Sequence, residues 1–232
     1  MASMKLRAAA LLSIAALSLT ACGSTTSSAS GSTDSASQTV TITDNDGEKS
    51  VATPPKSVVA TDNRTFETLS DWGVELKAGA VALMPDTIAY TKDEKIVDLG
   101  SHREPNLEAV VAVQPDLIIN GQRFTQHADK LKELAPNATL VNLDPRDGEP
   151  LDTELERQTT VLGEIFGKQD EAAKLVADLQ AAEKRVTDAY NPEDTVMGLI
   201  TSGGEFGYSA PGTGRTVGPL FDVLGLTPAL KL

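Results

Sequence analysis

The chain has 232 residues with 33 acidic and 20 basic side chains, which gives a formal net charge of −13 at pH 7. Nucleic acids and anionic lipid surfaces repel a protein with this excess of negative charge, so neither is expected as a partner. Cysteine occurs once and histidine twice, which excludes a disulfide framework and a histidine-rich metal centre.

The N-terminal segment carries targeting signals. A basic start precedes an apolar stretch at residues 8–19 that is too short to span a bilayer, as in a secretory signal peptide. The following Leu-Thr-Ala-Cys run ends at Cys22 and resembles the bacterial lipoprotein signal, in which the new N-terminal cysteine is acylated. We expect a signal peptide over 1–21, lipidation of Cys22 and a serine-rich linker over 22–37. The alternative is a plain secretory signal with a chance cysteine.

Strand and helix signals alternate after the linker. Residues 39–43 alternate in polarity, and Asn45-Asp46-Gly47 is a turn signal, which predicts a β-hairpin returning at 49–52. Residues 116–120 form a continuous apolar run of the kind that is buried in parallel sheets. The pattern predicts an α/β lobe over 38–166. Its further elements are a strand at 57–61, a helix capped by Asn63 and stopped by Gly73, apolar runs at 76–83 and 96–99, helices at 106–113 and 128–134, and a strand at 139–143.

Two helices are expected next. Thr153 and Glu156 fit a capping box, and the helix that they would begin ends at Gly167. Residues 170–190 form the longest periodic segment, with a stripe of apolar side chains opposite charged ones, so this helix would span about 30 Å. The stripe comprises Leu175, Val176, Leu179, Ala182 and Val186.

The remaining residues predict a strand at 195–201, a loop at 203–214 and a helix at 217–224. They would begin a second α/β lobe over 194–232, connected to the first by an interlobe helix segment over 167–193. Because this second part is so much shorter than the first, we expect an incomplete second lobe.

Several short sequence phrases stand out along the chain. They are EPNLE at 104–108, QPDLII at 114–119, SAPG at 209–212, GR at 214–215 and LFDVLGL at 220–226. Together with the order of elements, these phrases resemble ferric-siderophore substrate-binding proteins of ABC importers, in the subgroup that binds catecholate or mixed catecholate siderophores. The resemblance implies a bilobed periplasmic-binding-protein fold, with two α/β lobes joined by one long helix and the ligand in the cleft.

The same resemblance implies a function. The protein would be anchored by lipid to the extracytoplasmic face of the cell membrane, bind an Fe(III)-siderophore and deliver it to an ABC permease and its ATPase. No cofactor is implied, and we expect no enzyme, since no catalytic cluster stands out in the sequence. His102 and His127 do not form a zinc pattern, so no metal ligand is assigned.

Arginine suits a pocket for an anionic ferric catecholate, because its planar guanidinium is permanently charged and donates several hydrogen bonds. The resemblance places ligand-binding arginines at Arg123, just beyond the predicted strand 116–120, and at Arg215. A solvated loop residue and a salt bridge to a nearby acid are their respective alternatives. Arg64 and Arg103 could face the same cleft or be surface charges, and Tyr208 could line it or pack internally.

Two other readings stay open from the sequence. A cobalamin- or haem-binding protein would have the same architecture and differ in its ligand. A lipoprotein enzyme, or a remnant that binds nothing, belongs to another class, and failure of any metal chelate to bind would indicate it. By the resemblance, complete relatives hold a further arginine and the iron-coordinating histidine and tyrosine in the part of the second lobe that we expect to be missing.

Overall fold

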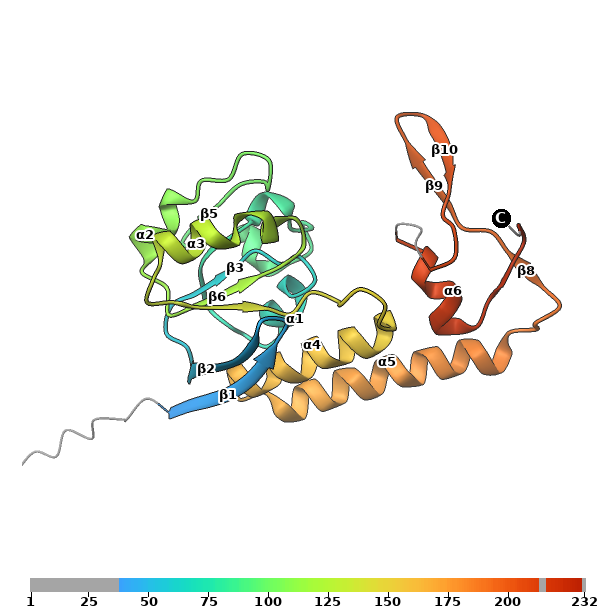
Figure 1. The fold of residues 1–232 in the computed structure, drawn as a ribbon, viewed down its shortest axis with the longest axis horizontal. Helices are drawn as coiled ribbons and strands as arrows, with labels where there is room; N and C mark the ends of the chain where they lie inside the picture. The colour runs from blue at the N-terminus through green and yellow to red at the C-terminus, as the bar shows by residue number, and fades with distance from the viewer. Residues whose placement is uncertain (1–37, 213–215, 231–232) are drawn as a thin grey trace, which may run out of the picture. The chain divides into compact units, whose positions relative to one another are not determined.

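The computed structural model of the chain describes residues 38–212 and 216–230 (Figure 1). The expected signal peptide, the acylated Cys22, the serine-rich linker and Arg215 lie outside these ranges and stay predictions. Within the ranges, no helix combines the length and the apolar character that crossing a membrane requires.

Five parallel strands form the central sheet in the order β5-β4-β3-β6-β7. The first strand of this sheet along the chain, β3, lies in the middle, and the chain adds strands first on one side of it and then on the other. The predicted strands are confirmed, although the apolar run at 76–83 ends as a strand at Gly79 and continues as the 3-10 turn η1 (Val81–Leu83). The strands are β3 (Val58–Ala60), β4 (Leu76–Gly79), β5 (Val97–Asp98), β6 (Leu117–Asn120) and β7 (Thr139–Asn142).

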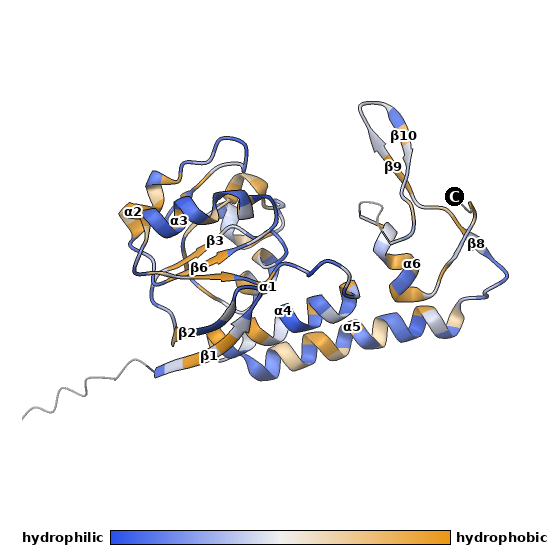
Figure 2. Cartoon of the chain, viewed as in Figure 1, coloured by the Kyte–Doolittle hydropathy of each residue, from blue (hydrophilic) through white to orange (hydrophobic). Residues whose placement is uncertain are grey.

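Side chains of the sheet alternate between two hydrophobic clusters. Leu117 and Ile119 belong to one cluster and Ile118 to the other, and all three are fully buried. Burial on both faces explains why the strands read as continuous apolar runs, which Figure 2 shows as orange segments of β3 and β6. The first cluster includes residues of α1 (Phe66–Asp71), α4 (Leu151–Phe166) and the hairpin of β1 (Gln38–Asp44) and β2 (Gly47–Thr53). The second includes residues of α2 (Glu108–Val113) and α3 (Ala128–Leu134).

The predicted capping box of the fourth helix is wrong. Helix α4 begins at Leu151 after Pro150, so Thr153 and Glu156 lie inside it, and no side chain caps its first turn. The start moves upstream because Pro150 can precede a helix without losing a hydrogen bond, and Glu154 in the first turn is held by arginine side chains instead.

The sequence predicted Asn63 as the N-cap of α1, and this prediction is wrong. The N-cap is Thr65, which makes no side-chain capping bond. Asp62 forms the preceding turn instead, since its carboxylate accepts from the Arg64 N–H at 2.9 Å while the Thr65 hydroxyl donates to the Asp62 carbonyl at 2.8 Å.

The long helix is confirmed as α5 (Gln169–Ala189), but its apolar stripe is not buried. Leu175 and Val186 are 41% and 43% exposed, and Ala172 is the one fully buried residue of the helix. Periodicity predicted the helix correctly but not what covers it. The division into two lobes joined by this helix stays a prediction.

The C-terminal residues form two small sheets rather than the single expected strand at 195–201. Gly198 separates the two strand segments, and a Cβ there would lie 2.7 Å from Val217 Cγ2, so the close contact requires glycine. The expected loop contains a further strand, because Gly203 and Gly204 both adopt positive φ and make a tight hairpin turn. The elements are β8 (Thr195–Val196) paired with β11 (Thr227–Pro228), β9 (Leu199–Ser202) paired with β10 (Glu205–Tyr208), and α6 (Gly218–Leu224).

Candidate ligand-binding site

A pocket of about 240 Å³ opens at the carboxyl ends of β3 and β6. These two strands are neighbours in the sheet, but the chain leaves them toward opposite sides, so the pocket lies at the topological switch point where open α/β sheets bind ligands. Its lining comes from the segment after β3, from η1, from the corner after β5 and from the 3-10 helix η3 (Gln122–His127). The lining residues are Thr61, Asn63, Leu83, His102, Gln122, Arg123 and Phe124.

Buried polar contacts hold the two strand ends together beneath the pocket. The Thr61 N–H donates to the Ile119 carbonyl at 2.9 Å, and the buried Thr61 hydroxyl donates to the Asn120 side-chain oxygen at 2.8 Å. At Gly121 a Cβ would lie 2.4 Å from the Asp62 carboxylate, so this position has room for glycine alone unless Asp62 moves. The floor of the pocket is therefore fixed by the fold.

Arg123 reaches the pocket from η3 without an acidic partner. Its side chain is exposed, and its Nη1 lies 3.5 Å from His102 Nε2. Arg103 in the neighbouring corner is also exposed. Within the described ranges, neither arginine has a carboxylate at ion-pair distance. These two guanidinium groups are therefore free to attract an anion.

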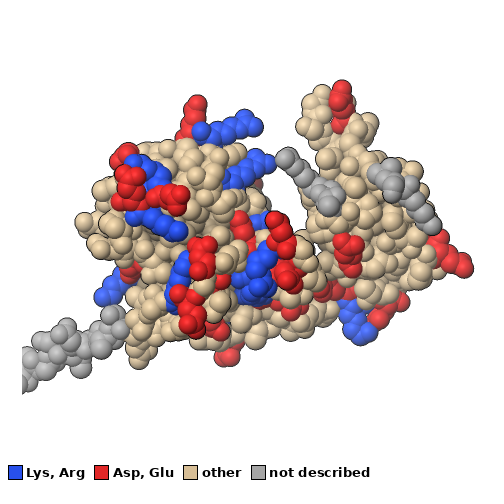
Figure 3. Space-filling model, in the orientation of Figure 1, with Lys and Arg blue, Asp and Glu red and all other residues tan. Residues whose placement is uncertain are grey.

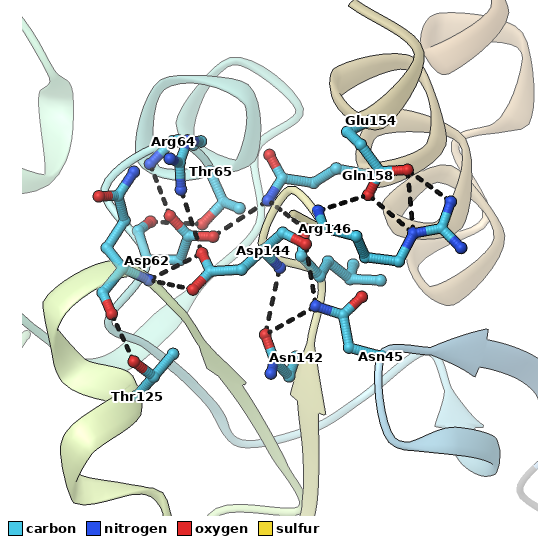
Figure 4. A network of polar contacts seen from close by, with 12 residues as sticks. Asn45, Asp62, Arg64, Thr65, Thr125, Asn142, Asp144, Arg146, Glu154 and Gln158 are labelled. Atoms are coloured by element: carbon cyan, nitrogen blue, oxygen red, sulfur yellow. Dashed lines mark hydrogen bonds and ion pairs between the residues drawn. The ribbon is translucent and has the colours of Figure 1, made fainter. Parts of the chain in front are cut away.

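Arg64 has a different environment. Its Nη1 lies 3.1 Å from a carboxylate oxygen of Asp144. With the Gln122 amide turned so that its oxygen faces the guanidinium, that oxygen accepts from Arg64 Nε and Nη2 at 2.8 Å each. The Asp144 carboxylate also accepts from the Gln122 N–H with both oxygens, at 2.8 and 2.9 Å. The charge of Arg64 is thus compensated within the protein, and its guanidinium contacts Gln122 at the start of η3. Figure 4 shows Arg64 in the same polar network as Asp144.

Asp62 is the buried acid of this polar network. Its carboxylate accepts from the Gln158 amide at 3.0 Å, and Figure 4 shows it between Arg64 and Asp144. Burial raises the pKa of Asp62, and the nearby Asp144 charge adds to this effect, whereas the Arg64 N–H acts against it. Asp62 orders the backbone behind the pocket and does not line it.

Glu154 on α4 is a second buried acid, and its side chain is not exposed to solvent. Arg146 contacts it through Nη2 at 2.5 Å and through Nε at 3.1 Å, and Arg157 Nη2 lies 2.8 Å away. The hydrogen bonds from Arg146, followed by those from Arg157, lower the pKa of Glu154 to about 2 despite its burial. The sequence did not point to either arginine, and both donate hydrogen bonds to the Glu154 carboxylate.

Larger hollows occur elsewhere, but each has an acid in its lining. One of about 340 Å³ contains Lys77 and Lys95, yet Glu75 and Asp93 line it as well. The hollow between α1 and α5, of about 460 Å³, is lined by Glu67, Asp71, Glu171 and Asp178 with one lysine. The groove between α4 and α5, of about 320 Å³, is lined mainly by alanine, valine and polar side chains, without a cation. Charge rather than volume therefore singles out the pocket at the switch point. Figure 3 shows lysine and arginine interspersed with acids over the visible face, so no broad basic surface competes there.

The structure places Arg123 at the expected strand end, close to His102 and His127, which the sequence did not connect with it. His127 Nε2 contacts the His102 carbonyl at 2.9 Å, so the two histidines, 25 positions apart, meet beside the pocket. The sequence signal that could have connected the two histidines is that both of their segments follow strands of one parallel sheet.

Tyr208 is not among the residues that line the pocket. It lies half-buried in β10, with its hydroxyl 3.5 Å from the Leu230 carbonyl.

The chain is similar in sequence to known binding proteins. The chain is 29% identical over 192 residues to the ferric-anguibactin-binding protein FatB of Vibrio anguillarum, a match covering 82% of this chain and 59% of the relative. It is also 29% identical over 224 residues to the petrobactin-binding protein YclQ of Bacillus subtilis, covering 93% of this chain and 68% of that protein. The chain thus spans less than two thirds of the length of the Vibrio relative.

Solved structures share the fold. The siderophore-binding protein BauB, in complex with two acinetobactin molecules and ferric iron, superposes with a TM-score of 0.74 at 23% identity, over 84% of this chain and 69% of BauB. A model of the periplasmic binding protein family matches residues 58–231, which include the whole parallel sheet and the pocket. From its sequence and its fold, this chain belongs to the periplasmic binding protein family.

Proposed function

We propose that the chain is the substrate-binding component of an ABC importer and binds a ferric siderophore of the anionic, catecholate type. The observation that carries the proposal is the Arg123 guanidinium, which lines a pocket at the switch point without an acid among the lining residues. Relatives named for binding ferric anguibactin and petrobactin support the ligand class.

The chemistry of the pocket matches part of such a ligand. A ferric catecholate carries net negative charge on oxygens that accept hydrogen bonds, and a guanidinium without an internal partner offers charge and planar donors to them. The pocket, at about 240 Å³, is smaller than the roughly 300 to 1,000 Å³ of typical small-molecule sites, so we propose that it takes part of the chelate rather than all of it. Arg103, Arg215, Arg64 and Tyr208 stay candidates for further contacts.

Arg123→Ala tests the binding role. The substitution should weaken binding of a ferric tris-catecholate chelate by about 1.5 to 3 kcal/mol, roughly tenfold or more, because a charge-assisted hydrogen bond is lost. Arg123→Lys should restore affinity partly, since it keeps the charge but not the planar fork. Quenching of the fluorescence of Trp72, the one tryptophan of the chain, measures binding.

A matched control separates the site from general electrostatics. Arg185 is exposed on α5, far along the chain from the pocket lining, so Arg185→Ala should leave the affinity unchanged. Equal affinity of the wild-type protein and the Arg123→Ala variant would contradict the assignment. Absence of binding by the wild-type protein to any ferric catecholate would contradict the proposed function.

Membrane attachment is a separate part of the proposal. Lipidation of Cys22 would place the protein on the extracytoplasmic face of the cell membrane, beside the ABC permease and its ATPase, and two acyl chains give stable anchoring. In cells grown with a fatty-acid analogue, the wild-type protein should carry the label and a Cys22→Ser variant should not. Equal labelling of both would exclude Cys22 as the acylated residue.

A further inference from the structure

We propose that His102 is a positioning residue, which holds the Arg123 guanidinium over the pocket by accepting a hydrogen bond at Nε2. The inference rests on the proposed function, since it concerns the arginine expected to bind the siderophore. Two lines of structural evidence support it: the contact itself, and the way in which the backbone of His102 is fastened to η3.

The contact determines which ring nitrogen carries the proton. Arg123 Nη1 lies 3.5 Å from His102 Nε2, and a guanidinium can only donate. His102 must therefore present a lone pair at Nε2 and carry its proton at Nδ1. This is the Nδ1–H tautomer of a neutral imidazole, and protonation of the ring would break the contact.

The surroundings of His102 favour the neutral ring. Partial burial lowers its pKa, and the nearby cations Arg123 and Arg103 and the ring of His127 act in the same direction. These are the charged and titratable groups that act on the ring. At pH 7 the imidazole is therefore an acceptor rather than a cation that would repel Arg123.

The backbone of His102 is fastened to the helix that carries Arg123. Its carbonyl accepts from His127 Nε2 at 2.9 Å and from Gln126 Nε2 at 3.1 Å, and both donors belong to η3. The His127 ring in turn packs edge-on against Phe124, with ring centroids 5.8 Å apart. The imidazole and the guanidinium are thus held from the same short helix, so their separation is set by local structure.

The other ring nitrogen is not the acceptor for Arg123. Nδ1 of His102 is buried and has no hydrogen-bond partner within the described part of the chain. In the inferred tautomer this atom carries the proton, so it offers Arg123 no acceptor. The acceptor that faces Arg123 is therefore Nε2 alone.

Three variants separate positioning from packing. His102→Gln keeps an acceptor near Nε2, whereas His102→Phe keeps a ring of similar size and removes the acceptor. We expect His102→Gln to bind a ferric tris-catecholate chelate with nearly the wild-type affinity and His102→Phe to bind it about twofold to tenfold more weakly. In an Arg123→Ala background, His102→Phe should cause no further loss.

The opposite pattern would overturn the inference. If His102→Phe binds as well as wild type, or weakens binding equally in the Arg123→Ala background, the imidazole does not act through Arg123. If wild type binds and Arg123→Ala weakens binding while His102→Phe has no effect, the proposed function stands and the positioning role fails.

A second measurement needs no ligand. Long-range ¹H–¹⁵N correlation spectra of the histidine rings report the tautomer, and we expect the Nδ1–H form for His102 in wild type. Arg123→Ala should raise the pKa of His102 in an NMR titration, because a nearby cation is removed. An Nε2–H tautomer in wild type would overturn the inference, even if no chelate binds to the chain.

Discussion

At the scale of single residues, the fold uses arginine in two ways. Arg146 and Arg157 compensate the buried carboxylate of Glu154, whereas Arg123 and Arg103 have no acid partner within the described ranges. Removing one partner of a buried ion pair leaves an unpaired charge, which costs more stability than an exposed pair contributes. Glu154 should therefore matter for stability, and Arg123, the arginine that lines the pocket, should matter for binding.

Glu154→Gln tests this distinction through pH. The pKa of Glu154 is lowered from 4.5 to about 2, so the ion pair stabilises the fold above pH 4.5, and this contribution is lost as the pH falls toward 2. The variant should lose about 3 kcal/mol of unfolding free energy at pH 7. The difference from wild type should shrink as the pH falls below 4.5.

Urea unfolding at several pH values measures this effect. Glu164→Gln is a matched control, because Glu164 lies on the same helix and forms no ion pair in the described structure. It should change stability little at any pH. A constant difference between wild type and Glu154→Gln from pH 7 to pH 3 would contradict the role of the lowered pKa.

At the scale of elements, sequence periodicity predicted the helices better than their burial. Residues 128–134 and the strands of the parallel sheet were found because apolar runs and helical periodicity are local signals, whereas both predicted helix N-caps were wrong. The stripe on α5 has the same periodicity as a buried face, yet Leu175 is 41% exposed. Periodicity reports which side chains share a face, but tertiary packing decides what covers that face.

The polar residues of the site show the same limit. Arg123 could be predicted because it follows a strand of the parallel sheet, where ligands bind. The contacts of His102, Asp62 and Glu154 could not be, since they join segments 21 to 96 positions apart or depend on a helix start that moved upstream. Local sequence patterns do not specify the partner atoms of such pairings, although the position of His102 and η3 after strands of one parallel sheet indicates that they lie close together.

Two leucines on neighbouring helices test the difference in burial. Leu162 on α4 is 1% exposed and belongs to the core, whereas Leu175 on α5 is 41% exposed. Leu162→Ala should reduce the free energy of unfolding by about 2 to 5 kcal/mol, because it leaves a cavity. Leu175→Ala should reduce it by only about 1 kcal/mol, because 41% of this residue is already exposed and its removal leaves no closed cavity. Comparable losses in urea unfolding would show that α5 is covered in solution.

At the scale of the whole molecule, two-stranded pairings occur in contrasting environments. The β1–β2 hairpin packs against the main core, and Ile42 and Val51 are 2% and 0% exposed. The β9–β10 hairpin lacks such cover, since Leu199 and Phe206 are 55% and 79% exposed. Beyond Pro192, Phe221 is the one large apolar side chain that is buried within the described ranges. An isolated two-stranded hairpin is only marginally stable in water.

In hydrogen exchange of the full chain, the protection of an amide should therefore depend on whether its strand packs against a hydrophobic core rather than on strand pairing alone. Amides of β9 and β10 should exchange through local opening far faster than those of β6, because few buried contacts oppose the opening. The β1–β2 hairpin is the matched control: it has the same two-stranded pairing but a buried face, so its amides at Ile42 and Val51 should be protected nearly as well as β6. Equal protection of β9–β10 and β6 would show that the exposed hairpin face is covered in solution, and a partner for Phe206 and Leu199 would then have to be sought.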